Sequence, residues 1–196
     1  MKHLAKIFLL PAAVVASLFS SPRAQAGPLG PEAAMLPAYC APRMADDYSS
    51  ASAKEWIDRF TMENYVHMHH YCIGLMELNR AYGKGRSRGA GDVASSIQNI
   101  DYVIKGTAPD FVLQPEFHLT KGKALAFMGR SELAALEFQQ AIQLKPDYGA
   151  AYAALSDFYA EKGAKQKARE TVEQGLEKIP DSKALKRRKA ELSKGK

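Results

Sequence analysis

Residues 115–181 read PEFHLTKGKALAFMGRSELAALEFQQAIQLKPDYGAAYAALSDFYAEKGAKQKARETVEQGLEKIPD, and one pattern is written twice in this stretch. Four pairs of equivalent residues lie 34 positions apart: Gly129 and Gly163, Ala134 and Ala168, Ile142 and Leu176, Pro146 and Pro180. A fixed period of this length indicates stacked helical units that each pack on the next, rather than a single sheet. The two units are expected at residues 115–148 and 149–182.

An earlier segment repeats the pattern less clearly. Pro109 precedes an Asp as Pro146 does, but the two prolines are 37 residues apart, so three residues are inserted. On this register Ile100 stands where Phe138 stands in the next unit. Residues 62–109 are therefore expected to form a degenerate first unit.

The end of the chain is expected to close the stack. Ser182 can cap a last helix over residues 183–192, whose apolar content is thin. A polar terminal helix is what a stack of repeats requires for solubility. The sequence thus predicts an all-α fold, a short right-handed α-solenoid of helix-turn-helix units with a C-terminal capping helix, and residues 52–196 form its helical domain.

The two clear units resemble the tetratricopeptide repeat family, whose members are helix-turn-helix repeats of 34 residues. The second unit carries the pattern as Tyr152, Leu155, Ser156, Tyr159, Gly163, Ala168, Val172, Gly175 and Pro180. The first carries it as His118, Lys121, Gly122, Leu125, Gly129, Ala134, Phe138, Ala141 and Pro146. It departs from the family at His118 and Lys121, where an aromatic residue and Leu are usual. The small residues Gly122 and Ser156 match the close crossing of the paired helices.

The resemblance implies a binding module without catalytic residues. In such repeats the first helix of each unit lines a concave groove that holds a peptide or a partner helix. The positions carried over to that groove are Leu119, Lys123, Phe127, Asp157, Ala160, Glu161 and Arg187, together with Glu191. Their charges are mixed, and no dense Lys/Asn cluster for a C-terminal carboxylate is present. We therefore expect a protein or peptide partner, no enzymatic activity and no cofactor.

The beginning of the chain predicts export. Residues 1–26 combine a basic start, an apolar run from Ile7 to Phe19 and an Ala24-Gln25-Ala26 cleavage site, which is the pattern of a signal peptide. The mature protein would start at Gly27, lack a transmembrane segment and be periplasmic or secreted. Residues 27–51 are rich in Pro, Ala and Ser and are expected to form an extended arm.

A helical face follows the arm. Ser52 and Glu55 form a capping box, and apolar residues then recur at helical spacing up to Tyr82, in one long helix or in two with a break near Thr61. A flexible basic loop is expected over residues 83–91. Asp92 can cap the next helix.

The two cysteines of the chain, Cys40 and Cys72, are expected to form a disulfide. An oxidising compartment favours this pairing, and the spacing does not match a redox motif. The bridge would pin the arm to the first long helix. The loop-entropy relation gives a stabilisation of about 3 kcal/mol.

A metal- or haem-binding protein is the alternative that the sequence leaves open. His67 and His70 share one helical face, while His69 points elsewhere, and three-residue spacing can place two imidazoles on one metal. No second cluster of ligands is evident, and the absence of a Cys-x-x-Cys-His motif argues against covalent haem. Metal binding is therefore the secondary hypothesis.

The charge distribution bears on nucleic acid as a partner. The formal net charge is +6, but the last 15 residues hold seven Lys or Arg and one Glu. The basic charge is therefore a tail, rather than a field over the whole protein. We expect no specific nucleic-acid binding, and no nucleotide-binding loop or catalytic triad is recognisable. The oligomeric state stays open.

Overall fold

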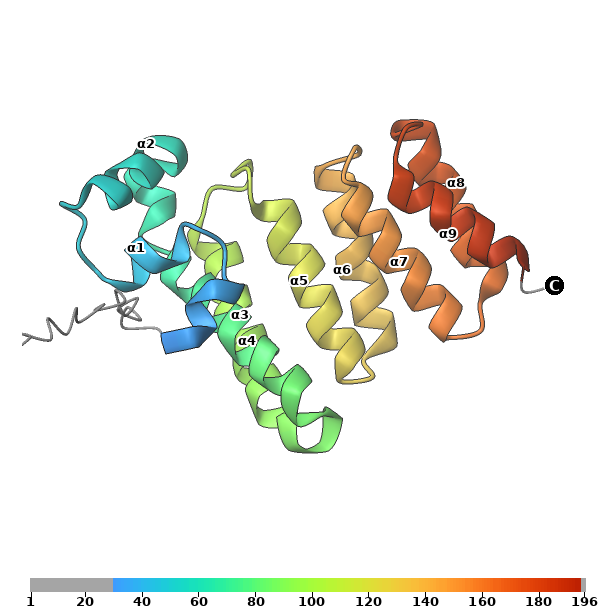
Figure 1. The fold of residues 1–196 in the computed structure, drawn as a ribbon, viewed down its shortest axis with the longest axis horizontal. Coiled ribbons are helices and arrows are strands. Elements are labelled where there is room, and N and C mark those ends of the chain that lie inside the picture. The colour runs from blue at the N-terminus through green and yellow to red at the C-terminus, as the bar shows by residue number, and fades with distance from the viewer. Residues whose placement is uncertain (1–29, 195–196) are drawn as a thin grey trace, which may run out of the picture.

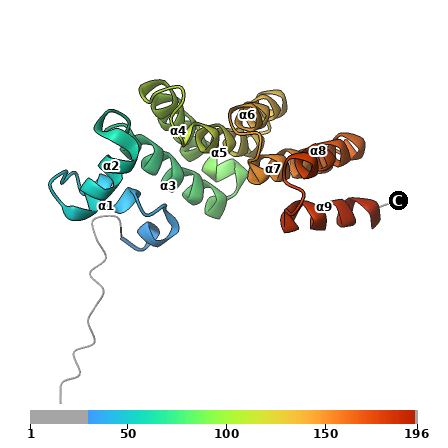
Figure 2. The ribbon, with the colours of Figure 1, turned by 90° about the horizontal axis from the view of Figure 1, so that it is seen from above.

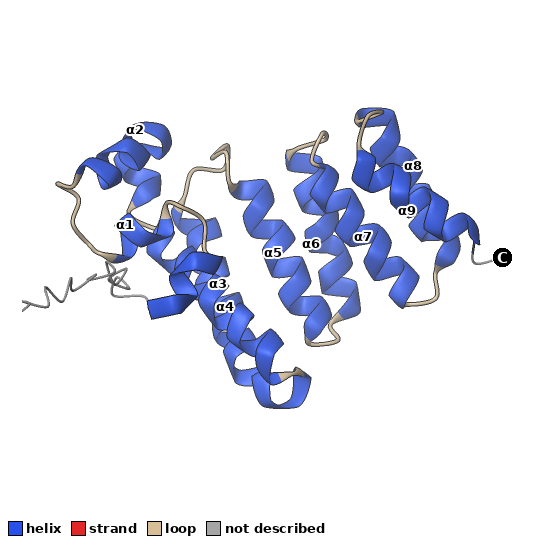
Figure 3. Cartoon of the chain, in the orientation of Figure 1, coloured by secondary structure: helices blue, strands red, loops and turns tan. Residues whose placement is uncertain are grey.

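The computed structural model describes residues 30–194, and every regular element among them is a helix (Figure 3). Three antiparallel pairs stack side by side: α3 (Met68–Lys84) with α4 (Arg86–Gly106), α5 (Gln114–Phe127) with α6 (Ser131–Leu144), and α7 (Gly149–Glu161) with α8 (Lys165–Lys178). The last helix, α9 (Lys183–Lys194), packs on α8 and α7 at the C-terminal end (Figure 1). The predicted all-helical stack of repeat-like helix pairs is confirmed.

The turns inside the second and third pairs are built in the same way. Gly129 has φ 76° and Gly163 has φ 74°, in the left-handed region that side chains with a Cβ avoid. The amide after each glycine donates to the carbonyl five residues earlier, from Arg130 to Leu125 and from Ala164 to Tyr159, both at 2.9 Å. This is the hydrogen-bond pattern of a Schellman helix end. The glycine period in the sequence therefore has a backbone cause.

The paired helices cross closely at the small residues. A Cβ on Gly122 would lie 2.6 Å from the ring of Phe138, which leaves no room for a side chain. In the next pair Ser156 donates a hydrogen bond of 3.0 Å to the Ala168 carbonyl. Ala134 and Ala168 are fully buried. Larger residues at these positions would force the helices apart.

The first pair repeats this crossing with different residues. A Cβ on Gly74 would lie 3.3 Å from Ile100, and Ser96 donates a hydrogen bond of 2.7 Å to the Gly74 carbonyl. Ile100 and Val103 are fully buried. The core of this pair thus uses an equivalent glycine, although α4 has 21 residues and α6 has 14.

The prediction of a flexible loop over residues 83–91 is wrong. Gly85 alone makes the turn with φ 75°, and α4 already begins at Arg86. Gly89 lies inside α4, where a Cβ would approach the Ala81 carbonyl oxygen to 2.7 Å, so this glycine permits close packing rather than flexibility. Asp92 does not cap a helix, because it lies inside α4, where its carboxylate pairs with Lys84 at 2.7 Å.

The helix before the first pair is α2 (Ala51–Tyr65). It is interrupted at Thr61, which is one of the two alternatives that the sequence predicted. Thr61 has φ 62° and ψ 154°, a conformation that few residues other than glycine adopt. The Asn64 amide bonds to the Thr61 hydroxyl, and its oxygen accepts from the Ala108 amide, which ties the break to the rest of the fold. The N-cap is Ser50, which accepts from the Ala53 amide, so the prediction of Ser52 was wrong by two residues.

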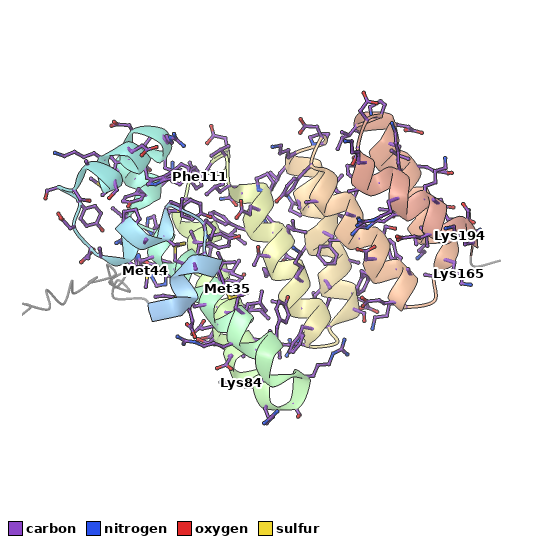
Figure 4. All side chains as sticks on the ribbon, viewed as in Figure 1. Met35, Met44, Lys84, Phe111, Lys165 and Lys194 are labelled. Atoms are coloured by element: carbon purple, nitrogen blue, oxygen red, sulfur yellow. A yellow bond between two sulfur atoms is a disulfide. The ribbon has the colours of Figure 1, made fainter. Side chains whose placement is uncertain are left out.

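The segment over residues 27–51 is not an extended arm where the structure describes it. It contains η1 (Gly30–Met35) and α1 (Cys40–Met44), which lie against α3 (Figures 1 and 4). The Cys40–Cys72 disulfide joins α1 to α3. Composition predicted an extended chain because it takes no account of this cross-link or of the burial of Tyr39. We call residues 30–44 the N-terminal arm.

The buried Arg43 holds the arm from its other end. Its guanidinium donates to the carbonyls of Tyr65 and Val66 at the end of α2, at 3.0 and 2.7 Å. None of the helices within residues 30–194 has the length and apolar character to cross a bilayer. The predicted signal peptide lies outside the described residues.

Candidate partner-binding groove

The helices form two rows when the stack is seen from above (Figure 2). The first helices of the pairs, α3, α5 and α7, make the inner row, and α4, α6 and α8 make the outer row. The N-terminal arm and α9 stand forward of the inner row at the two ends. The inner row is therefore the floor of a concave face bounded by these two elements.

A pocket of about 310 Å³ opens on this concave face. It is lined by Tyr82, Arg86, Lys123, Ala126, Phe127, Phe138, Ala154, Asp157, Phe158 and Glu161. Four of these ten residues are among the eight predicted for the groove: Lys123, Phe127, Asp157 and Glu161. The structure thus brings together positions from two units that the sequence separates by more than 30 residues.

Aromatic side chains from two units meet in the pocket. The rings of Tyr82 and Phe127 meet edge to face with centroids 5.1 Å apart, and the Arg86 guanidinium lies 5.9 Å from the Phe127 ring. Tyr82 is still 45% exposed, and its burial raises the pKa of the phenol, which stays a neutral donor. Sequence reasoning missed Tyr82 and Arg86, because Tyr82 was assigned to the core and Arg86 to a loop.

The acidic wall of the pocket is tied to the capping helix. Arg188 on α9 makes a two-pronged bond to the Asp157 carboxylate, with distances of 2.8 and 2.6 Å. This bond raises the pKa of Arg188. The predicted residue, Arg187, instead contacts Glu191 at 3.7 Å and is 70% exposed. Of the two neighbouring arginines of α9, Arg188 rather than Arg187 thus contacts a residue of the pocket lining.

Besides Arg187 and Glu191, two other predicted groove residues lie outside the pocket lining. Leu119 is only 3% exposed and belongs to the core cluster that includes Leu155, so a partner cannot reach it without unpacking α5. Its position follows from the rotation of α5, which turns this residue toward α7. Ala160 is half-buried and lies outside the pocket lining.

The opposite end of the concave face is occupied by the N-terminal arm. Tyr39 of the arm and Tyr71 of α3 both donate to the same oxygen of Glu116 on α5, at 3.3 and 3.0 Å. Burial, and secondarily the Glu116 carboxylate, raises the pKa of both phenols far above the ordinary range and raises that of Tyr148 to about 12. All three stay protonated, so these contacts persist at any physiological pH. The inner face of α3 is thus partly covered within the chain.

The departures from the repeat pattern at His118 and Lys121 have a structural reason. His118 Nδ1 lies 2.6 Å from Glu137 Oε2, and the Lys121 ammonium lies 2.6 Å from Glu137 Oε1 and 2.8 Å from Asp101. Burial alone would raise the pKa of Glu137, but the bonds from His118 and Lys121 outweigh it and lower that pKa. An ion network therefore replaces the usual apolar contacts.

The histidine cluster has partners that fix its rings. His69 Nδ1 lies 2.8 Å from Arg43 Nη2, and His70 Nδ1 lies 2.8 Å from Asn99 Oδ1. His67 and His70 both face Tyr102, with ring centroids 5.8 and 3.8 Å away. Within residues 30–194 no three His, Cys, Asp or Glu side chains form a group that could hold a metal ion. The geometry therefore offers nothing that favours the metal hypothesis.

Comparisons with known proteins bear on the C-terminal part of the chain. A family model described as a tetratricopeptide repeat matches residues 125–192, which include α6, α7, α8 and most of α9. No curated protein matches. One similar solved structure is the second TPR domain of the human RPAP3 protein in complex with the HSP70 peptide SGPTIEEVD, with a TM-score of 0.46 and 17% identity over 65% of this chain and 98% of that chain. A likeness this distant carries no argument about the ligand of this chain.

Proposed function

We propose that this chain is a non-enzymatic scaffold that binds a peptide or a helix of a partner protein in the groove of α5, α7 and α9. The family match of residues 125–192 supports the class, because tetratricopeptide repeats act as protein–protein interaction modules. The single observation that supports the place is the pocket on the concave face, where Lys123, Phe127 and Glu161 converge.

The side chains that line the pocket also support this face as the binding surface. Ala126 and Ala154 are small residues beside the aromatic rings of the pocket, and they leave room for a partner to approach the helices. Concave sites that combine apolar surface with a few convergent polar groups are the usual binding sites of proteins. A second candidate function is not proposed, because no contact favours one.

We further propose that the protein acts outside the cytoplasm, in the assembly of a periplasmic or envelope complex. The signal-peptide pattern of residues 1–26 supports export. A disulfide between Cys40 and Cys72 agrees with an oxidising compartment.

Quantitative capture of partners from the native host tests the groove. We choose Phe127→Ala with Glu161→Ala, because Glu161 makes no ion pair among the described residues and its loss should leave the fold intact. A matched control is Leu136→Ala with Glu132→Ala, which alters one exposed apolar and one acidic residue on the outer helix α6.

The groove variant should bind the specific partner about five- to thirtyfold more weakly, as expected when a central aromatic contact worth about 1–2 kcal/mol is removed. The control variant should retain it. Both variants should show the circular dichroism of the parent. Equal capture by the folded groove variant and the parent would contradict the proposed site.

A further inference from the structure

The charges around the groove pocket are of opposite sign on its two walls. Arg86 and Lys123 stand on the side of α4 and α5, and Glu161 stands on the side of α7. These three side chains form no ion pair with any described residue, whereas the nearby Asp157 is already paired with Arg188. Three uncompensated charges therefore face the pocket, two basic and one acidic.

The floor between these walls is apolar. Phe127 and Phe158 come from the adjacent helices α5 and α7, with Ala126 and Ala154 beside them. Phe158 is 6% exposed and rests on Phe138, with ring centroids 5.9 Å apart, so the floor is fixed by the core beneath it. A large apolar side chain is the group that such a floor receives best.

The spacing of the walls sets the length of the matching segment. Helices packed directly against each other, as α5 and α7 are, have axes about 8–10 Å apart. An extended chain advances roughly 3.3 Å per residue and presents every second side chain to the same face. Residues at positions one, three and five of an extended peptide can therefore reach one wall, the floor and the other wall.

We infer that the groove selects a mixed-charge segment, in which a large apolar residue lies between an acidic residue that meets Arg86 and Lys123 and a basic residue that meets Glu161. This inference rests on the proposed function and adds the chemistry of the partner. Complementary charges lower the free energy of the complex, while a like charge on either wall is repelled. The same segment can bind in either chain direction, so charge composition rather than order is selected.

Fluorescence anisotropy with four labelled peptides tests the inference on the purified protein with its disulfide intact. The cores are Asp-Gly-Phe-Gly-Lys, Asp-Gly-Phe-Gly-Asp, Lys-Gly-Phe-Gly-Lys and Asp-Gly-Ser-Gly-Lys, each flanked by Gly and Ser. The mixed-charge Phe peptide should bind tightest, about fivefold tighter than either single-sign peptide, from about 1 kcal/mol for one exposed charge contact. The Ser peptide should bind weakest.

Charge variants make the test specific to the pocket. Glu161→Lys makes both walls basic and should switch the preference to the peptide with two Asp residues. The matched control is Glu63→Lys, which makes the same change on an exposed residue of α2, away from the pocket, and should retain the mixed-charge preference.

The outcomes separate this inference from the function on which it rests. Equal affinities for the three Phe peptides would overturn the inference, and so would a switch of preference in Glu63→Lys. No binding by any peptide would also overturn it. In each of these cases the capture experiment with Phe127→Ala and Glu161→Ala still decides the proposed function by itself.

Discussion

Removal of the disulfide by Cys40→Ala with Cys72→Ala should destabilise the N-terminal end of the stack. The bridge closes a loop with a sequence separation of 32 residues. For this loop the chain-entropy relation gives about 3–4 kcal/mol of stabilisation, a large part of the 5–15 kcal/mol typical of a domain. At roughly 2–4 °C per kcal/mol for a chain of this size, the melting temperature should fall by about 6–16 °C.

The structure also predicts where the loss appears. In a stack of repeats each unit contacts only its neighbours, so the arm and α3 should loosen before α7 and α8. Thermal melting by circular dichroism gives the size of the loss. Hydrogen exchange resolved by segment gives its place, with the oxidised parent as reference and the reduced parent as a second form without the bridge.

Two results would refute this reasoning. A fall in melting temperature of less than about 2 °C would mean that the disulfide contributes almost none of the expected entropic stabilisation. Tyr39 and Arg43 would then hold the arm without the cross-link. An equal gain in exchange across α3 and α8 would show that the units do not respond independently.

Three further predictions concern the turns, the ion network and the N-terminus. Gly163→Ala should lower the free energy of unfolding measured by urea titration by about 1 kcal/mol, because φ is positive at this residue. Gly91→Ala should raise it by about 0.5–1 kcal/mol, because this residue lies inside α4 with open space around it. Because the pKa of Glu137 is lowered in the folded state, its carboxylate stabilises the fold above the ordinary pKa of 4.5, and this stabilisation is lost as the pH falls through the lower folded pKa. Glu137→Gln should therefore lose less stability than the parent when the pH is lowered below about 4.5. Expressed in its host, the protein should be recovered from the periplasm or medium with Gly27 as its first residue by mass spectrometry, and an intact N-terminus in the cytoplasm would exclude export.

The repeat period was the part of the fold that local sequence could predict. Gly129 and Gly163 are required by backbone conformation, and Gly122 and Ser156 by the close crossing of helices, so the same residue types recur at a fixed interval. The first pair was harder to delimit from the sequence. Its crossing glycine, Gly74, packs against α4, which is seven residues longer than the equivalent helix α6.

The features that sequence reasoning missed depend on contacts between distant residues. Composition could not show that the N-terminal arm folds against α3. The arm is held by hydrogen bonds from Tyr39 and Arg43 to partners 20 or more residues away in the sequence. Glycine content at residues 83–91 was read as flexibility, whereas Gly89 serves the close packing of two helices.

The candidate site was predictable to within one helical step. Family positions located Lys123, Phe127, Asp157 and Glu161 on the pocket, since these depend only on the phase of α5 and α7. The burial of Leu119 and the contact of Arg188 with Asp157 depend on how α5 and α9 dock, which the family positions alone do not give. Tyr82 enters the pocket from another unit, a juxtaposition that only the packed structure reveals.

The central claim is that the concave face of α5 and α7 is the binding surface. Site-specific photo-cross-linking in the native host tests this claim most directly. A photoreactive amino acid replaces Lys123, Glu161 or, as the control on the outer row, the exposed Leu136 of α6. The account predicts that the first two positions cross-link to the same partner protein and that the control position does not. Cross-links to a partner from Leu136 with none from Lys123 and Glu161 would contradict it.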